Sequence, residues 1–301
     1  MTQILITGGT GFIGQRLCTL ARQRGMRVAV YSRQPAAKVR QLCGDTVQPI
    51  ASLAELGSLK SIDHVINLAG EPILSGRWTR HRKQVLRDSR IELTRQLVDA
   101  LSRLPTKPAT FISGSAIGYY GDTGETVCHE TQPAGTDFAA TLCRDWERAA
   151  QPVGALGSRL CMLRTGVVLD GNGGPLQKML TPFKLGLGGR IGSGQQWFSW
   201  ISLEDICELI FFLIDNTDCR GAFNATAPEA VRNEVFTRTL AEHLHRPAKL
   251  PMPAAVLKAA LGEASILLLG SQKVYPQAAL QAGFQFQHPT LGQALEHMLP
   301  A

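Results

Sequence analysis

Short apolar runs alternate with longer amphipathic segments through the first half of the chain. This alternation is typical of βαβ units, in which helices cover both faces of a parallel sheet. The sequence therefore predicts an α/β fold built around a Rossmann-type, doubly wound parallel sheet. The expected strands are residues 3–7, 27–31, 64–68, 109–113 and 160–165, and the expected helices are residues 14–24 and 83–104.

The pattern changes after Leu169. Gly and Pro become dense in residues 170–194, and the later segments no longer alternate regularly. Such a stretch is typical of loops around a ligand. We predict a dinucleotide-binding domain over residues 1–169, to which later strands are free to return. The smaller C-terminal substrate lobe is expected over residues 170–301, with a helix at residues 254–261.

A glycine-rich motif directly follows the first expected strand and opens the first expected helix. It reads Thr-Gly-Gly-Thr-Gly-Phe-Ile-Gly over residues 7–14. Gly8 permits a sharp turn, Gly11 leaves room for a pyrophosphate, and Gly14 lets the helix pack close to the sheet. Free N–H groups at the start of the helix favour a phosphate. The expected cofactor contacts are Gly8, Thr10, Gly11, Phe12, Ile13 and Gly14.

The end of the second expected strand selects the dinucleotide. An acidic residue there would bind the adenosine ribose, whereas a cation accommodates a 2′-phosphate. Ser32 and Arg33 occupy this place. A guanidinium can form forked hydrogen bonds with a phosphate, and a serine hydroxyl can donate to it. NADP(H) is therefore predicted in preference to NAD(H), and the alternative is that Arg33 is a solvated side chain without a ligand.

Composition and charge narrow the class of protein. The 301 residues are 44% hydrophobic and 18% charged, with a formal net charge of +7. The basic residues are dispersed, and the densest run, residues 77–90, also suits an anionic cofactor. No apolar run approaches the roughly 20 residues that cross a bilayer. We expect a cytoplasmic protein with a small-molecule substrate and neither a nucleic-acid nor a membrane partner.

The seven cysteines are scattered, odd in number and without a C-x-x-C pair. This arrangement predicts reduced, mostly buried thiols in place of a disulfide framework. The histidines lack the spacing of metal ligands, so no metal site is predicted.

Several further motifs together resemble the extended short-chain dehydrogenases/reductases, the class of nucleotide-sugar epimerases and dehydratases. The resemblance covers essentially the whole chain. It is strongest to an epimerase-like subfamily that includes human short-chain dehydrogenase family 39U member 1 and bacterial homologues. Besides the glycine motif, the matching segments are Asn-Leu-Ala-Gly-Glu-Pro at 67–72, Ser-Arg at 89–90, Gly-Ser-Ala-Ile-Gly-Tyr-Tyr-Gly at 114–121, Leu-Arg-Thr-Gly-Val-Val-Leu at 163–169, and Pro-Phe-Lys-Leu-Gly-Leu-Gly-Gly at 182–189.

The resemblance implies further cofactor contacts. Leu68, Ala69 and Gly70 would line the adenosine and ribose side, and Arg90 and Arg164 would reach polar groups of the cofactor. The ends of parallel strands form the ligand crevice in such sheets, which agrees with this placement. The alternative for Arg90 is a solvated residue on a helix.

The catalytic pattern of the family is interrupted in this chain. Family members that transfer hydride use a Ser or Thr and a Tyr-x-x-x-Lys pair, in which the ammonium lowers the pKa of the phenol. Phe138 and Leu142 stand where this pair is expected, and Ala116 stands at the serine position. Phenyl cannot donate a proton, and leucine carries no charge. The remaining catalytic candidates are Ser115, Tyr119 and Tyr120, of which each tyrosine can act as an acid or only pack.

Two functional hypotheses follow. The first is an NADP(H)-dependent oxidoreductase or epimerase that acts on a small polar, sugar-like carbonyl or alcohol. The second is a sensor or regulatory scaffold that binds NADP(H) and has lost the residues for hydride transfer. A homodimer through the helix expected at residues 83–104 is a further prediction from the resemblance.

Overall fold

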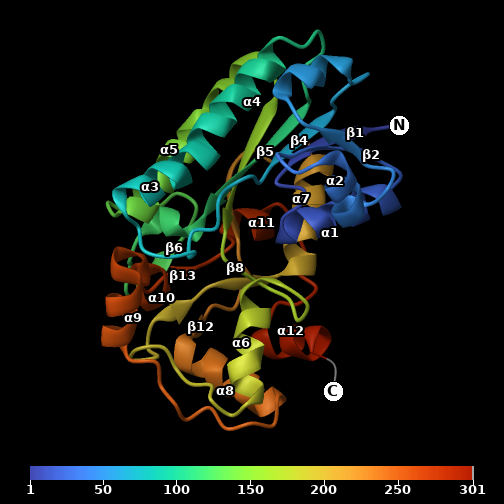
Figure 1. Cartoon of the computed structure of the whole chain (residues 1–301). Helices are drawn as coiled ribbons and strands as arrows, with labels where there is room; N and C mark the ends of the chain where they lie inside the picture. Colours follow the sequence, from blue (N-terminus) through green and yellow to red (C-terminus); the bar gives the residue numbers. More distant parts are fainter. Residues whose placement is uncertain (300–301) are drawn as a thin grey trace.

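A computed structural model describes residues 1–299 of the chain. Its central sheet consists of β1 (Gln3–Thr7), β2 (Arg27–Tyr31), β3 (Gln48–Ile50), β4 (His64–Asn67), β5 (Thr110–Ala116), β7 (Arg159–Thr165) and β11 (Gly221–Ala225). The strand order is β11-β7-β5-β4-β1-β2-β3, and every neighbouring pair is parallel (Figure 1). The chain runs outward from β1 on one side and returns to continue on the other. This confirms the predicted Rossmann-type sheet.

Helices cover both faces of this sheet (Figure 1). One face carries α1 (Phe12–Gln23), α2 (Ala36–Cys43), α7 (Leu203–Asp215) and α11 (Gln277–Gln281), and the other carries α4 (Leu93–Ser102) and α5 (Phe138–Ala150). Ile4 and Ile6 belong to the apolar cluster that includes α1 and α7, whereas Leu5 belongs to the cluster that includes α4. Because both faces are buried, successive strand positions are apolar, which explains the short continuous runs in the sequence.

Two elements near the cofactor end differ from the expected boundaries. The segment expected as one helix at 83–104 is α3 (Arg80–Arg87), a π-helical turn (Asp88–Glu92) and then α4. π-helical turns inside helices are frequent at functional sites, and this one carries Arg90. Strand β5 continues to Ala116 because Ser115 and Ala116 pair with the end of β7. Apolar periodicity does not reveal this extension, since the added residues are small or polar.

A smaller lobe lies beyond the carboxyl end of the sheet (Figure 1). Its apolar cluster includes Leu176, Phe183, Trp200, Phe236 and Leu295. The chain after residue 169 contributes to both parts of the molecule, because β11 joins the central sheet and α7 packs against one face of it. The elements of the lobe are α6 (Gly174–Lys184), α8 (Asn233–His243), α12 (Leu291–Met298), the paired strands β8 (Val167–Leu169) and β10 (Trp200–Ser202), and the paired strands β9 (Trp197–Phe198) and β12 (Val231–Arg232).

The segment between α8 and α12 runs back toward α3 and α5 (Figure 1). It contains α9 (Ala254–Leu261), α10 (Ile266–Leu269) and β13 (Lys273–Val274), which pairs with β6 (Val127–Cys128). The helix expected at residues 254–261 is therefore present.

All seven cysteines are buried and free. No helix among residues 1–299 is both long enough and apolar enough to cross a membrane. In the same part of the chain, no group of three or more His, Cys, Asp or Glu side chains is arranged to hold a metal ion.

Candidate functional site

The glycine motif forms a tight turn between β1 and α1. Gly8 has a φ of 72°, and its carbonyl accepts a hydrogen bond of 2.9 Å from the Gly11 N–H. A Cβ atom on Gly8 would lie 2.8 Å from the carbonyl carbon of Leu68, and one on Gly14 would lie 2.2 Å from the Gly8 oxygen. Gly11 is the N-cap of α1 and leaves the helix without a side-chain cap. The first N–H groups of a 12-residue helix therefore remain available for an anion, which suits a pyrophosphate.

The ends of β1 and β4 are joined directly beside this turn. The Thr7 hydroxyl donates to Asn67 Oδ1 at 2.7 Å, and the Ala69 N–H donates to Thr7 Oγ1 at 3.2 Å. The sheet order changes direction between these two strands, and such a switch point is where open α/β sheets bind ligands. The structure thus brings Leu68 and Ala69 next to Gly8, where a single cofactor cleft is predicted.

Arg33 projects into solvent after β2. Its side chain is 86% exposed, and its Nη2 lies 2.8 Å from Oε1 of Glu71, which follows β4. Arg82 Nη1 lies 3.5 Å from the other oxygen of Glu71. The hydrogen bond from Arg33 is the largest cause that lowers the pKa of Glu71 below its usual value. Ser32 lies beside Arg33 and accepts a hydrogen bond from the Gln34 N–H at 3.1 Å.

Arg90 lies against the main chain after β4. Its Nη2 donates to the Glu71 carbonyl at 3.0 Å, and its guanidinium lies 5.3 Å from the centre of a Trp146 ring. A Cβ atom on Gly70 would lie 2.9 Å from Arg90 Cζ, so glycine at this position permits the contact. Burial lowers the pKa of Arg90. The cation is therefore held at the edge of the same cleft, behind residues 68–70.

Arg164 lies in a buried polar network at the end of β7. Its Nε and Nη2 atoms donate to the two carboxylate oxygens of Glu147 at 2.8 and 3.0 Å, and the two side chains are only 5% and 7% exposed. The Ser115 hydroxyl donates to the same carboxylate at 2.7 Å. Burial by itself lowers the pKa of Arg164, but hydrogen bonding and charge attraction from Glu147 outweigh burial and raise it.

The two candidate tyrosines have different surroundings. The Tyr120 hydroxyl donates to Asn224 Oδ1 at 2.6 Å and accepts from Arg164 Nη1 at 3.1 Å, and burial raises the pKa of Tyr120 to about 12. The Tyr119 ring stacks on Arg164, with Cζ 3.5 Å from the ring centre. Within residues 1–299 nothing forms a hydrogen bond with the Tyr119 hydroxyl, and the residue is partly exposed. Of the two phenols, Tyr119 is therefore the one free to meet a ligand.

The chain is similar over most of its length to proteins of one known family. The model of the NAD dependent epimerase/dehydratase family matches residues 4–226. This chain belongs to that family. An epimerase family protein of Mycobacterium bovis is 40% identical over 293 residues, which cover 97% of this chain and 96% of that protein. A chloroplastic SDR39U1 homologue of Arabidopsis thaliana is 37% identical over 302 residues, covering 98% and 86%.

A solved structure of the human epimerase family protein SDR39U1 (isoform 2) with NADPH has a TM-score of 0.90 to this chain. It is 35% identical, and the match covers 99% of each chain. This confirms the predicted resemblance to the SDR39U1 subfamily. A second model, that of a domain of unknown function, matches residues 252–298. That match covers α9, α10 and β13, which run back toward α3 and α5, and it continues through α12 in the lobe.

The segment between α8 and α12 packs against Phe138 and Leu142, the residues predicted to stand at the Tyr and Lys positions of the family. Leu142 is 1% exposed and lies in an apolar cluster with Trp146 and Ala264, of which Ala264 belongs to the matched segment. Phe138 packs edge-on against Trp78, with ring centres 4.9 Å apart, and Lys83 Nζ lies 4.7 Å from the Phe138 ring centre. Aromatic and aliphatic side chains therefore stand where the Tyr-x-x-x-Lys pair is expected.

Two carboxylates of the site, Glu147 and Glu71, are not predicted from the sequence. Glu147 lies on the buried stripe of α5, one position after Trp146 and four after Cys143, so helical spacing alone signals a buried acid in need of a partner. Glu71 lies inside the quoted motif at residues 67–72, but its pairing with Arg33 depends on the sheet order. Asn224, the partner of Tyr120, gives no signal in the sequence beyond its place in a strand.

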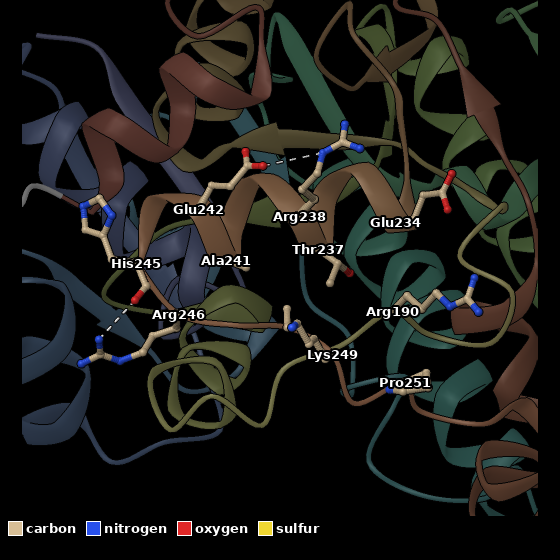
Figure 2. Close-up of a pocket in the computed structure, with 11 residues that line it drawn as sticks. Arg190, Glu234, Thr237, Arg238, Ala241, Glu242, His245, Arg246, Lys249 and Pro251 are labelled. Atoms are coloured by element: carbon tan, nitrogen blue, oxygen red, sulfur yellow. Dashed lines mark hydrogen bonds and ion pairs between the residues drawn. The ribbon is translucent and has the colours of Figure 1, made fainter.

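A hollow lies on the lobe, beside α8 (Figure 2). It has a volume of about 820 Å³ between α8 and the chain that follows it. None of the predicted cofactor or catalytic residues lines it. Its lining residues are Arg190, Glu234, Thr237, Arg238, Ala241, Glu242, His245, Arg246, Ala248, Lys249 and Pro251.

Proposed function

We propose that this chain binds NADP(H) across the glycine turn and acts as an oxidoreductase or epimerase on a small polar, sugar-like carbonyl or alcohol. The observation that carries the cofactor choice is Arg33, an exposed guanidinium beside the glycine turn at the position where an NAD-specific sheet carries an acid. The NADPH in the human SDR39U1 structure supports the same choice. In this proposal, residues 8–14 hold the pyrophosphate, residues 68–70 line the adenosine side, and Ser32 assists Arg33.

Arg90 and Arg164 have different parts in this proposal. Arg90 lies at the cleft edge and reaches a polar group of the cofactor directly. Arg164 is held by Glu147 and stacks on the Tyr119 ring, which in this proposal faces the bound cofactor. The Tyr119 hydroxyl then supplies the proton that the family tyrosine would supply. Ser115 keeps the Glu147 carboxylate in place.

Replacing Arg33 tests the cofactor choice. Arg33→Ala removes the guanidinium that binds the 2′-phosphate, and the loss of charge-assisted hydrogen bonds is expected to weaken NADPH binding about tenfold. NADH lacks this phosphate, so its dissociation constant is expected to stay within about twofold of the wild-type value. Both constants are measured by fluorescence titration of the full chain. Equal weakening of NADPH and NADH would refute the role of Arg33.

A sensor or regulatory scaffold is the second candidate. The burial of Leu142 in an apolar cluster favours it, because this arrangement leaves no ammonium at the family position to lower the pKa of a phenol. The two candidates differ in NADPH oxidation over a panel of sugar-like carbonyl compounds. Turnover supports the enzyme, whereas tight NADPH binding without turnover on any compound supports the sensor.

A further inference from the structure

A carboxylate lies between two guanidinium groups at the carboxyl edge of the sheet. Glu71 lies 2.8 Å from Arg33 and 3.5 Å from Arg82. Arg33 follows β2, Glu71 follows β4 and Arg82 comes from α3. Because β1 lies between β2 and β4, the Arg33–Glu71 ion pair spans the end of β1, where the glycine turn begins. Among residues 1–299, Glu71 is the only acid that forms an ion pair with Arg33, and the two residues lie on opposite sides of the predicted cofactor cleft.

We propose that Glu71 competes with the 2′-phosphate of NADP(H) for Arg33. When the phosphate binds Arg33, the Glu71 carboxylate pairs with Arg82 alone. This inference rests on the proposed function, in which Arg33 binds that phosphate. The ligand class is a nucleotide that carries a phosphomonoester on its adenosine ribose. A nucleotide with a free 2′-hydroxyl has no phosphate to bind Arg33, so it leaves the Arg33–Glu71 ion pair intact.

Arg33, Glu71 and Arg82 differ in side-chain mobility, as the exchange of Arg33 from Glu71 to the phosphate requires. The Arg33 side chain is 86% exposed, so it can turn toward a ligand without breaking core contacts. The main chain of Glu71 is fixed, since its N–H donates to Ser89 Oγ at 3.1 Å and its carbonyl accepts from Arg90 at 3.0 Å. Within Glu71, only the side chain can shift away from Arg33 toward Arg82, which already contacts its other oxygen.

Arg82 is the anchored partner. Its side chain is 21% exposed, and its Nη2 donates to Ser75 Oγ at 2.6 Å and to the Pro72 carbonyl. A phosphomonoester carries about −1.5 to −2 charges at pH 7. With Arg33 bound to the phosphate, Glu71 would lie near this negative charge without a cationic partner if Arg82 were absent. The lowered pKa of Glu71 keeps the carboxylate ionised at neutral pH, so the competition operates there.

Removal of the competing charge tests the inference. Glu71→Gln keeps the size of the side chain and is expected to tighten NADPH binding about two- to fivefold, the range of a partly exposed ion pair. The dissociation constant of NADH is expected to stay unchanged. The matched control is Glu242→Gln, which removes an exposed carboxylate 3.9 Å from Arg238 on the lobe (Figure 2). This control should leave both constants unchanged at the same ionic strength.

A double-mutant cycle tests the part of Arg82. Arg82→Gln is expected to weaken NADPH binding in the wild-type background, because Glu71 then has no second partner. The same change should have no effect on NADPH in the Glu71→Gln background. Three results would overturn the inference: no tightening by Glu71→Gln, equal tightening of NADPH and NADH, or the same loss from Arg82→Gln in both backgrounds. If Arg33→Ala weakens NADPH selectively while Glu71→Gln has no effect, only this inference fails, and the proposed function stands.

Discussion

At the scale of single residues, the function depends on which hydroxyl can reach a ligand. Tyr119 stacks on Arg164 with its hydroxyl free of protein partners in the described residues, whereas the Tyr120 hydroxyl is engaged by Asn224 and Arg164. We expect Tyr119→Phe to lower kcat of NADPH-dependent turnover by about 10²- to 10⁴-fold, the contribution of a general acid. The dissociation constant of NADPH should not change. Full turnover by Tyr119→Phe would remove this tyrosine from the chemistry.

The buried ion pair makes a second residue-scale prediction. Glu147→Gln leaves the Arg164 charge buried without its partner, and breaking a buried pair in this way costs about 3–5 kcal/mol. The free energy of unfolding from urea titration should fall by that amount. Arg103→Ala, which removes an exposed pair with Asp99, is the control and should cost at most about 1 kcal/mol. Similar small losses for both variants would show that the Glu147 carboxylate is not tightly paired in solution.

At the scale of elements, the turn from β1 into α1 is the decisive structure. A Cβ atom on Gly14 would lie 2.2 Å from a main-chain oxygen, which cannot move without opening the turn. Gly14→Ala is therefore expected to abolish measurable nucleotide binding in fluorescence titration and to lower the melting temperature. A Cβ atom on Gly57 would meet nothing within 4 Å, so Gly57→Ala should keep both properties. Unchanged binding by Gly14→Ala would contradict the close packing of helix and turn.

The elements also show how far the sequence determines the site. The turn, β1 and β2 are predicted closely because glycine spacing and apolar runs are local signals. The π-helical turn around Arg90 is not predicted, since a single five-residue turn is too short to give an apolar periodicity distinct from that of the flanking α-helices. The acidic partners of Arg33 and Arg164, Glu71 and Glu147, are also not predicted from the sequence. They come from other strands and helices, and only the assembled sheet brings them together.

At the scale of the whole molecule, the C-terminal segment closes over the first turns of α5. Leu142 is buried there beside Ala264, so the family lysine cannot simply be restored. Leu142→Lys places a charge in an apolar cluster and is expected to lower the free energy of unfolding by several kcal/mol. Leu142→Met, which conserves volume, should cost less than about 1.5 kcal/mol. Equal stability of the two variants in urea titration would show that the segment does not cover this position in solution.

The predicted homodimer through α3 and α4 also belongs to this scale and stays a prediction, as does the assignment of residues 170–301 to the substrate lobe. Within one chain, the segments that follow β1, β2 and β4, together with Arg90, supply all of the proposed nucleotide contacts. We therefore expect nucleotide affinity to be independent of protein concentration.

The most direct test of the account is a calorimetric titration of the wild-type full chain with NADPH and with NADH. The account predicts one saturable NADPH site per chain and weaker binding of NADH under the same conditions. Absence of measurable heat and of any fluorescence change with either nucleotide, from folded protein, would contradict it.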